Sequence, residues 1–368
     1  VELAFQNQLL GHPGSRSVIK DRRGQIVEDV GSIKLPQDGK DIRLALDSKI
    51  QYLAYSHLKQ AITDYKAKAG GVVVVDAKTG EILALANWPT YNPNNRERLT
   101  GAQLRNRAIT DTYEPGSVMK PFVAALALEA GKVRFDTVIN CAPGKLTIGT
   151  ATISDSHPHG ALTVAQVIQK SSNVGTAKIA SMLTPQQMWD MYDAIGLGQP
   201  PRLGFPGEVA GRLRPWKTWR PIEQATMSYG HGLSISLMQL ARAYTIFARE
   251  GDVIPLTLTK VEGDPVGASP VFSQQTAREV RAMLELAVQP GGTAPKAQIP
   301  GYRVAGKTGT AYKIEGGQYV KKYVASFVGF APASDPRLVV AVMIDEPGGA
   351  AHYGGDVAGP IFSNVMSG

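Results

Sequence analysis

The sequence is poor in cysteine, in aromatic residues and in long apolar runs. Among its 368 residues there is one cysteine, Cys141, and aromatic residues make up 7%. One cysteine excludes an internal disulfide, and we interpret Cys141 as a structural thiol because no motif surrounds it. No apolar run approaches the roughly 18 residues that a membrane-spanning helix needs. Basic clusters are no longer than pairs such as Arg22-Arg23 and contain no interleaved aromatic residues, which argues against nucleic-acid binding.

The composition is otherwise that of a folded globular protein with a basic excess. Hydrophobic residues make up 43%, charged residues 19%, and the formal net charge is +8. A positive balance fits an anionic substrate or surface, and it equally fits an ordinary solvated surface. The chain starts at Val1 without a methionine or a basic-then-apolar leader, so we expect it to be a fragment of a longer protein.

Strand patterns lie at both ends of the main region, and helical patterns lie between them. A helix is predicted after a cap at Asp47 or Ser48 and is expected to end at Gly70. Predicted strands cover 71–76, 81–86, 302–314, 319–332 and 337–344, and predicted helices cover 117–130, 163–170, 174–183, 237–249 and 361–366. These segments predict an α+β fold, with an antiparallel sheet of about five strands flanked by helices and a helical lobe beside it.

Residues 1–46 differ from the rest of the chain. They are polar, rich in glycine and proline, and contain one predicted hairpin whose strands, 17–20 and 25–28, flank the turn 21–24. A lone hairpin is barely stable in water, so this segment needs support from the main domain or from a region outside the sequence. We therefore predict a linker-like segment over 1–46 and one domain over 47–368.

Three short polar motifs follow one another along the chain: Ser117-Val-Met-Lys120, Ser171-Ser-Asn173 and Lys307-Thr-Gly-Thr310. Each motif by itself is common, since the first two also describe helix caps and the third an exposed turn. Together they supply a nucleophile, a base, a proton shuttle and an anion clamp. The ordered set therefore predicts an acyl-transfer site.

The first motif predicts an activated serine. Residues three apart on a helix share a face, so Lys120 lies beside Ser117 and within reach as its base. The preceding segment, 114–116, places Ser117 in the first turn, where unpaired N–H groups favour negative charge. Lys120 acts as a base only when neutral, and burial together with a neighbouring cation, Lys307, favours the neutral form.

The second motif follows the predicted helix 163–170. Ser171 lies where this helix ends, so we expect its hydroxyl to project into a cleft and to pass a proton between Lys120 and a leaving nitrogen. Asn173 is expected to donate to a substrate amide carbonyl and to hold Lys120 in place.

The third motif lies on a predicted strand. Thr308 and Thr310 offer hydroxyl donors for a carboxylate, and Lys307 supplies positive charge. Gly309 leaves room for a substrate backbone to pass closely. The N–H groups of Thr310 and Ser117 are predicted to form an oxyanion hole.

The same region also matches a phosphate-binding pattern, since 301–308 fits G-x-x-x-x-G-K-[ST]. An NTPase is thus a rival from another functional class. A phosphate loop needs a buried strand before it and a helix after it. Here 289–300 is rich in proline and glycine, and 309–317 has the composition of a strand. We therefore disfavour the NTPase.

With its three motifs the chain resembles the penicilloyl-serine transferases. It is similar to class B penicillin-binding proteins, and within them to the division-specific septal branch, over roughly residues 15 to 368. The segments that carry this likeness are 91–95, 105–107, 114–117, 170–175, 204–208 and 353–355. The resemblance implies the penicilloyl-serine transferase fold, with 1–46 as the remnant of an N-terminal pedestal and 47–368 as a transpeptidase domain.

The resemblance also implies a function. Ser117 would attack the penultimate D-alanine of a peptidoglycan stem peptide, an amine of a second stem would resolve the acyl-enzyme, and β-lactams would acylate Ser117. Tyr353 would line the substrate wall, whereas Tyr312 stands where relatives often carry a basic residue. The implied setting is the periplasm, on a single-pass inner-membrane anchor absent here, with divisome membrane proteins as partners and with no cofactor or metal.

Other activities use a similar site. A class A β-lactamase needs a deacylating glutamate, usually in Glu-x-x-x-Asn, and no such pattern occurs between Asn173 and Lys307. A carboxypeptidase and a non-catalytic β-lactam sensor stay open, because acceptor access and signalling leave little trace in sequence. His157-Pro-His159 and His231 are interpreted as surface or packing residues rather than metal ligands, because no zinc spacing surrounds them.

Overall fold

The structure is a computed structural model that describes residues 1–265 and 267–368. It divides into two compact units: Val1–Leu44 with Gly204–Pro206, and Ala45–Leu203 with Gly207–Gly368. Within the described residues, no helix combines the length and the hydropathy needed to cross a membrane.

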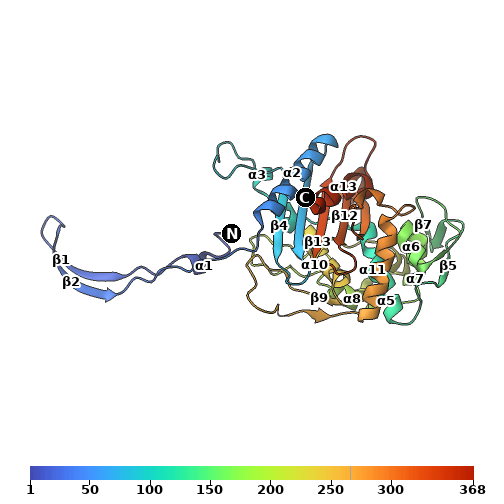
Figure 1. The fold of residues 1–368 in the computed structure, drawn as a ribbon, viewed down its shortest axis with the longest axis horizontal. Coiled ribbons are helices and arrows are strands. Elements are labelled where there is room, and N and C mark those ends of the chain that lie inside the picture. The colour runs from blue at the N-terminus through green and yellow to red at the C-terminus, as the bar shows by residue number, and fades with distance from the viewer. Residues whose placement is uncertain (266) are drawn as a thin grey trace. The chain divides into compact units, whose positions relative to one another are not determined.

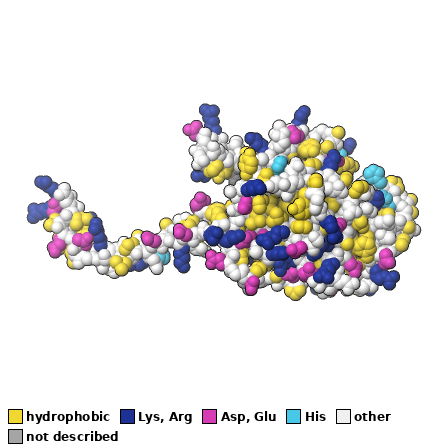
Figure 2. All heavy atoms as spheres, in the orientation of Figure 1, with side chains coloured by type: hydrophobic (Ala, Val, Ile, Leu, Met, Phe, Trp, Pro, Cys, Tyr) yellow, Lys and Arg dark blue, Asp and Glu magenta, His cyan; other side chains and the backbone are white. Residues whose placement is uncertain are grey.

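The smaller unit contains a hairpin with little cover. Helix α1 (Gln6–Leu9) precedes strands β1 (Ser15–Lys20) and β2 (Ile26–Lys34), which pair antiparallel as the sequence predicts. Apolar side chains such as Ile19, Val27 and Ile33 are exposed on this ribbon, and Figure 2 shows hydrophobic side chains on its surface. The hairpin therefore has no core of its own among the described residues. The boundary at residue 46 and the pedestal origin of this segment stay predictions.

The larger unit is built on one antiparallel sheet with the strand order β11-β12-β13-β3-β4 (Figure 1). Its strands are β3 (Ala69–Asp76), β4 (Ile82–Trp88), β11 (Ala305–Glu315), β12 (Gln318–Ala331) and β13 (Leu338–Asp345). The sheet joins segments from both ends of the unit, because β13 pairs with β3. The predicted five-stranded antiparallel sheet and α+β class are confirmed.

The centre of the sheet is buried on both faces. All residues of β3 are buried, and Val72–Val75 are 0% exposed, as expected of a strand covered on both sides. Helices α2 (Ser48–Asp64) and α13 (Gly359–Ser367) share one core with Val72 and Val74. Helix α10 (Leu237–Ala248) packs on β3 and β13 and is buried along nearly its whole length.

The predicted end of the helix that follows Asp47 is wrong. Helix α2 begins after the Asp47 cap as expected, but it ends at Asp64 rather than at Gly70. Gly70 belongs to β3, where it pairs with Ile344 and lies so close to Leu58 that a Cβ atom would approach Leu58 Cδ1 to 2.9 Å. Packing of the strand beneath the helix therefore requires this glycine.

A helical lobe lies beside β11 (Figure 1). Its helices are α5 (Lys120–Glu129), α6 (Val164–Lys170), α7 (Asn173–Ala180), α8 (Pro185–Ala194), α9 (Pro221–Met227) and α11 (Gln274–Val288). Short elements complete the chain: α3 (Gly101–Leu104), α4 (Arg107–Thr110), the 3-10 turns η1 (Gly116–Met119), η2 (Trp216–Thr218) and η3 (Pro295–Ala297), β5 (Val138–Asn140), β6 (Lys145–Ile148), β7 (Ala151–Ser154), β8 (Ala161–Thr163), β9 (Asp252–Val253), β10 (Ser269–Pro270) and α12 (Gly354–Val357). Contacts of α11 with β11 and α6 join the lobe to the sheet.

Candidate active site

Ser117 lies in the 3-10 turn η1 and not in the α-helix predicted over 117–130. The α-helix begins at Lys120, with Pro121 in its first turn, where the missing N–H is harmless. Gly116 has a φ of +64°, which glycine adopts without strain. A Cβ at Gly116 would lie 3.3 Å from the carbonyl oxygen of Thr310, so the backbone of the serine turn is close to β11.

Several hydrogen bonds fix this turn. Gly116 N donates to Gly230 O at 3.1 Å, and Gly232 N donates to the Glu114 carboxylate at 2.7 Å. The hydroxyl of Tyr244 donates to Val118 O at 2.7 Å from the buried helix α10. The turn is therefore held by backbone and side-chain groups of residues that are remote in sequence.

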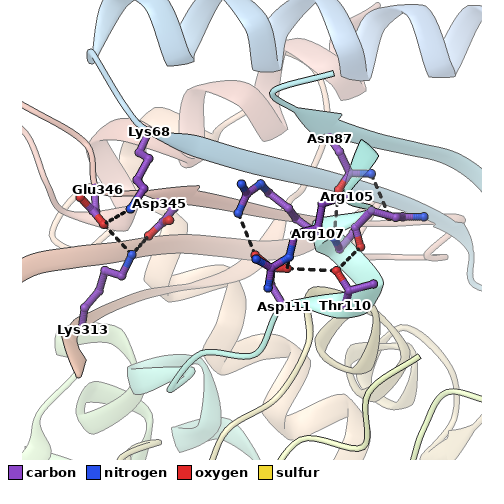
Figure 3. A network of polar contacts seen from close by, with 11 residues as sticks. Lys68, Asn87, Arg105, Arg107, Thr110, Asp111, Lys313, Asp345 and Glu346 are labelled. Carbon is purple, nitrogen blue, oxygen red and sulfur yellow. Dashed lines mark hydrogen bonds and ion pairs between the residues drawn. The ribbon is translucent and has the colours of Figure 1, made fainter. Parts of the chain in front are cut away.

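A polar network anchors the segment that enters this turn (Figure 3). Asp111 accepts from Arg107 Nη1 at 2.9 Å and is 2.7 Å from Arg105 Nε. Asn87, on β4, donates to Asn106 at 2.9 Å and accepts from the backbone at residue 108. The network ties the approach to Ser117 to the edge strand of the sheet.

Lys120 is fully buried and bonded to the second motif. Its Nζ donates to the backbone oxygen of Ser171 and, at 3.1 Å, to Ser171 Oγ. Burial lowers the pKa of Lys120 well below its usual value, the positive charge of Lys307 lowers it further, and Asp155 opposes the shift. A neutral amine is thus favoured next to Ser171.

Ser171 lies between two lysines. It caps α6 in the left-handed region, with φ 59° and ψ 43°, and its Oγ accepts from Lys307 Nζ at 2.9 Å as well as from Lys120. A hydroxyl has two acceptor sites and keeps its own proton to donate. Burial lowers the pKa of Lys307 to about 7. The three groups form one continuous hydrogen-bonded path.

Asp155 is a residue that sequence reasoning missed. Its carboxylate accepts from Ser172 Oγ at 2.7 Å and from Val174 N at 3.0 Å, so it fixes the start of α7 directly after Ser171. Asn173 Nδ2 donates to Ser154 O at 3.0 Å on the same neighbouring segment. The expected contact of Asn173 with Lys120 stays a prediction. The sequence around Asp155 contains no pattern that predicts this role, because its partners Ser172 and Val174 lie 17 and 19 residues further along the chain.

The third motif lies on β11, as predicted. Thr308 Oγ1 is 3.0 Å from the hydroxyl of Thr293, and Thr310 Oγ1 accepts from Gly354 N at 3.0 Å. A Cβ at Gly309 would lie 2.5 Å from Ser326 Oγ and 2.6 Å from Pro115 O. The near neighbours of Gly309 are therefore β12 and the serine turn, and passage of a substrate backbone there stays a prediction.

The far end of β11 is held by charge pairs (Figure 3). Lys313 Nζ donates to Asp345 at 2.8 Å and to Glu346 at 2.7 Å, and Lys68 donates to Glu346 at 3.0 Å. Burial lowers the pKa of Lys313 and raises that of Glu346, but the hydrogen bonds outweigh it. The bonds from Lys313 to Asp345 and Glu346 raise the pKa of Lys313, and the bonds from Lys313 and Lys68 lower the pKa of Glu346 to about 2. These pairs fix the strand beyond Tyr312.

One cleft of about 650 Å³ brings the three motifs together. Six candidate residues line it: Ser117, Ser171, Asn173, Thr308, Thr310 and Tyr353. Lys120 and Lys307 are fully buried and reach the site through Ser171. Tyr353 is 53% exposed and packs beside His352, with a ring-centroid distance of 4.4 Å.

The phosphate-loop alternative does not fit this environment. Lys307 and Thr308 are followed by a strand that continues to Glu315 and not by a helix, so the amides of a helix N-terminus do not face this lysine. In the described part of the chain, no group of three or more His, Cys, Asp or Glu side chains is arranged to hold a metal ion.

Comparisons with known proteins show which proteins this chain is similar to. Residues 70–367 match the family described as penicillin binding protein transpeptidase domain. The chain is 49% identical to "Probable peptidoglycan D,D-transpeptidase PenA" of Neisseria gonorrhoeae, covering 100% of this chain and 63% of that protein. It is 42% identical to "Peptidoglycan D,D-transpeptidase FtsI" of Escherichia coli K12, again over 100% of this chain and over 62% of the relative.

The fold has a close counterpart among solved structures. The transpeptidase domain of Burkholderia pseudomallei penicillin-binding protein 3 is 53% identical, with a TM-score of 0.82 over 88% of this chain and 94% of that one. This chain therefore belongs to the penicillin-binding protein transpeptidase domain family, and the predicted family and fold are confirmed. The chain spans about 63% of the length of the PenA relative.

Proposed function

We propose that the chain is the catalytic part of a septal peptidoglycan D,D-transpeptidase that β-lactams acylate and inhibit. The observation that carries this proposal is the hydroxyl of Ser171, which accepts from Lys120 and Lys307 beside the cleft that Ser117 lines. The names of the PenA and FtsI relatives and of the penicillin-binding protein 3 structure support the same activity.

In the proposed acylation, Ser117 Oγ attacks the carbonyl of the penultimate D-alanine while neutral Lys120 takes its proton. The oxyanion forms near the N–H groups of Ser117 and Thr310. The two backbones are close together, because a Cβ at Gly116, the residue before Ser117, would lie 3.6 Å from Thr310 N. Lys120 returns the proton through Ser171 to the leaving nitrogen, and the peptide C–N bond breaks. The terminal D-alanine departs and a serine ester remains.

The second half-reaction reverses these transfers with a new amine. An amine of a neighbouring stem peptide attacks the ester, its proton passes to Lys120, and Ser117 leaves as the hydroxyl. The leaving or entering carboxylate is held by Lys307 and by the hydroxyls of Thr308 and Thr310, two residues that line the cleft. Asn173 and Tyr353 complete the substrate walls.

The proposal extends to the whole protein. Residues 47–368 act as the transpeptidase domain, and 1–46 are the remnant of an N-terminal pedestal. The longer protein holds this domain in the periplasm on a single inner-membrane helix and works with divisome membrane proteins. This part rests on the likeness to longer relatives such as FtsI.

Intact-protein mass spectrometry tests the proposal. Incubation with a penicillin should add the mass of one drug molecule, the adduct should persist for hours, and Ser117→Ala should abolish it. An adduct that survives Ser117→Ala, or no adduct on the parent protein, contradicts the proposal. Transfer of a model acyl donor to an added amine separates a transpeptidase from a β-lactam sensor, because a sensor stops at the acyl-enzyme.

A further inference from the structure

One pair of titratable side chains beside the serine turn takes no part in the proton path through Ser171. The pair is His231 and Glu114, and His231 is one of four histidines that line the catalytic cleft. The segment that carries His231 runs along the serine turn, since Gly230 O accepts from Gly116 N at 3.1 Å. His231 therefore directly follows a residue that is bonded to the serine turn.

The two segments are packed closely. Gly230 has a φ of +84°, which glycine adopts without strain, and a Cβ there would lie 2.1 Å from Gly116 O. A few residues further along each segment, Tyr113 and Ile235 exchange two backbone hydrogen bonds of 3.0 Å. The segments thus lie side by side over several residues, which fixes the backbone of His231 next to the serine turn.

Glu114 presents a fixed carboxylate to the ring of His231. Its Oε1 accepts from Gly232 N at 2.7 Å, and its Oε2 accepts from the hydroxyl of Tyr319 at 3.0 Å. His231 Nδ1 is 3.8 Å from Oε2, which is too long for a hydrogen bond but close enough for an ion pair. The Glu114 side chain is only 9% exposed, so water screens the pair weakly. Glu114 therefore stabilises a positive charge on His231.

The surroundings of His231 favour a neutral ring that can exchange protons with solvent. Burial lowers the pKa of His231, Glu114 opposes this shift, and a positive charge on Lys120 adds to it. The ring also lies near Tyr229 and Tyr319, at centroid distances of 5.3 Å and 6.1 Å, and burial raises the pKa of both phenols, so they stay neutral. Because the His231 side chain is 26% exposed, a proton taken up by the ring has a way out.

Attack of an amine on the acyl-enzyme releases one proton more than Lys120 can recycle. An aliphatic amine such as that of a lysine side chain has a pKa of about 10, so near neutral pH it arrives as an ammonium. The ammonium must lose one proton before its lone pair can attack, and the nitrogen loses a second proton as the amide forms. Lys120 takes the second proton and returns it to Ser117 Oγ, which leaves Lys120 unchanged. The first proton needs another acceptor.

Resting on the proposed function, we propose that His231 is the catalytic base that takes this first proton from the acceptor ammonium. Nδ1 faces Glu114, so Nε2 receives the proton, and the nitrogen of the acceptor keeps the electron pair of the broken N–H bond. The imidazolium pairs with Glu114 and then releases its proton to solvent. The free amine attacks the ester, the new C–N bond forms, and the bond to Ser117 Oγ breaks while Lys120 moves the second proton.

The experiment compares two acceptors that differ in the charge of the amine near neutral pH. D-Alanine carries an ammonium, whereas hydroxylamine is largely neutral. A thioester of an N-acyl-D-alanine serves as the acyl donor, and the transfer products are measured by mass, with the reaction in the absence of enzyme subtracted. His231→Gln should lower the rate of transfer to D-alanine about a hundredfold, at the lower end of general base catalysis. Transfer to hydroxylamine and acylation by a penicillin should change less than about twofold, because neither needs the first proton removed.

His12→Gln, at an exposed histidine outside the cleft, is the matched control and should transfer to both acceptors at the parent rate. A His231→Gln protein that transfers to D-alanine at the parent rate overturns the inference. An equal fall with D-alanine, hydroxylamine and penicillin also overturns it, because the ring would then only support the serine turn. Failure of the parent protein to transfer the acyl group to either amine would instead contradict the proposed transpeptidase.

Discussion

The two walls of the cleft hold their functional groups by different means. On the helical wall, Ser117 lies in a 3-10 turn and Ser171 in a left-handed cap, and both depend on individual polar contacts from remote segments. On the strand wall, Lys307–Thr310 continue the unbroken register of β11 against 325–328 of β12. The helical wall therefore holds its two serines in conformations outside regular α-helix, whereas the strand wall holds its residues in regular antiparallel pairing. Substitutions on the two walls should therefore differ in how strongly they affect acylation and stability.

The largest expected effect is on the helical wall, at Lys120. Lys120→Met keeps an apolar, unbranched side chain in the buried position but removes the base, so we expect acylation by a penicillin to fall about 10⁴-fold. Thermal unfolding should occur at or above the parent temperature, because burying an amine is unfavourable. Lys49→Met, at an exposed lysine at the start of α2, is the control. A Lys120→Met protein that acylates at the parent rate would remove Lys120 from the mechanism.

On the strand wall, Gly309→Ala tests packing. The new Cβ would collide with Ser326 Oγ and Pro115 O, so β11 must shift away from the serine turn. We expect a loss of about 1–3 kcal/mol in the free energy of unfolding and about a hundredfold fall in acylation, since a displacement near 1 Å has that effect.

Gly101→Ala is the matched control, because a Cβ at Gly101 meets no atom within 4 Å. Denaturant unfolding and acylation rates measure both effects. If Gly309→Ala is as stable as the parent protein, β11 moves to accommodate the new Cβ at little cost in free energy, which contradicts the rigid strand wall.

Lys307→Arg tests the charge on the strand wall. With its pKa near 7, Lys307 loses its proton as the pH rises through that value, so binding of a carboxylate should weaken above pH 7. Arginine stays charged, so the alkaline decline in acylation by a monoanionic penicillin should disappear in Lys307→Arg. The maximal rate should be about tenfold lower, because a planar guanidinium replaces a compact ammonium. Lys321→Arg, at an exposed lysine, is the control and should keep the alkaline fall in the acylation rate. If Lys307→Arg also keeps this fall, a group other than Lys307 causes it.

The smallest effect is expected at Asp155. This residue belongs to none of the three motifs and supports the helical wall through Ser172 and Val174. Asp155→Ala removes the acceptor for Ser172 and Val174 and should lower the free energy of unfolding by about 2 kcal/mol. Acylation should fall several-fold as Ser171 loses its support. Asp155→Asn keeps one acceptor oxygen and should lie between the parent and the alanine variant. Equal behaviour of the two variants would argue that packing, and not hydrogen bonding, matters here.

Local pattern predicted the elements that carry strong periodicity. The valine-rich strand at 72–75, the Asp47 cap and a hairpin over 17–28 are all visible in the sequence, because burial and turn chemistry act over a few residues. The structure extends the hairpin to 15–34. The end of α2 was misplaced, because Gly70 serves a strand whose partner, β13, lies about 270 residues away. In the sequence, a glycine that ends a helix cannot be told apart from a glycine that allows a strand to pack closely under a helix.

The sequence by itself determined the family, the α+β sheet and the three polar motifs, because each depends on residue types at fixed local spacing. Only the tertiary structure decided that Ser171 lies between Lys120 and Lys307, that Asp155 supports it, and that four histidines share the cleft. These facts depend on contacts between segments tens to hundreds of residues apart. Burial then fixes the charge of the lysines, and burial is a property of the assembled fold.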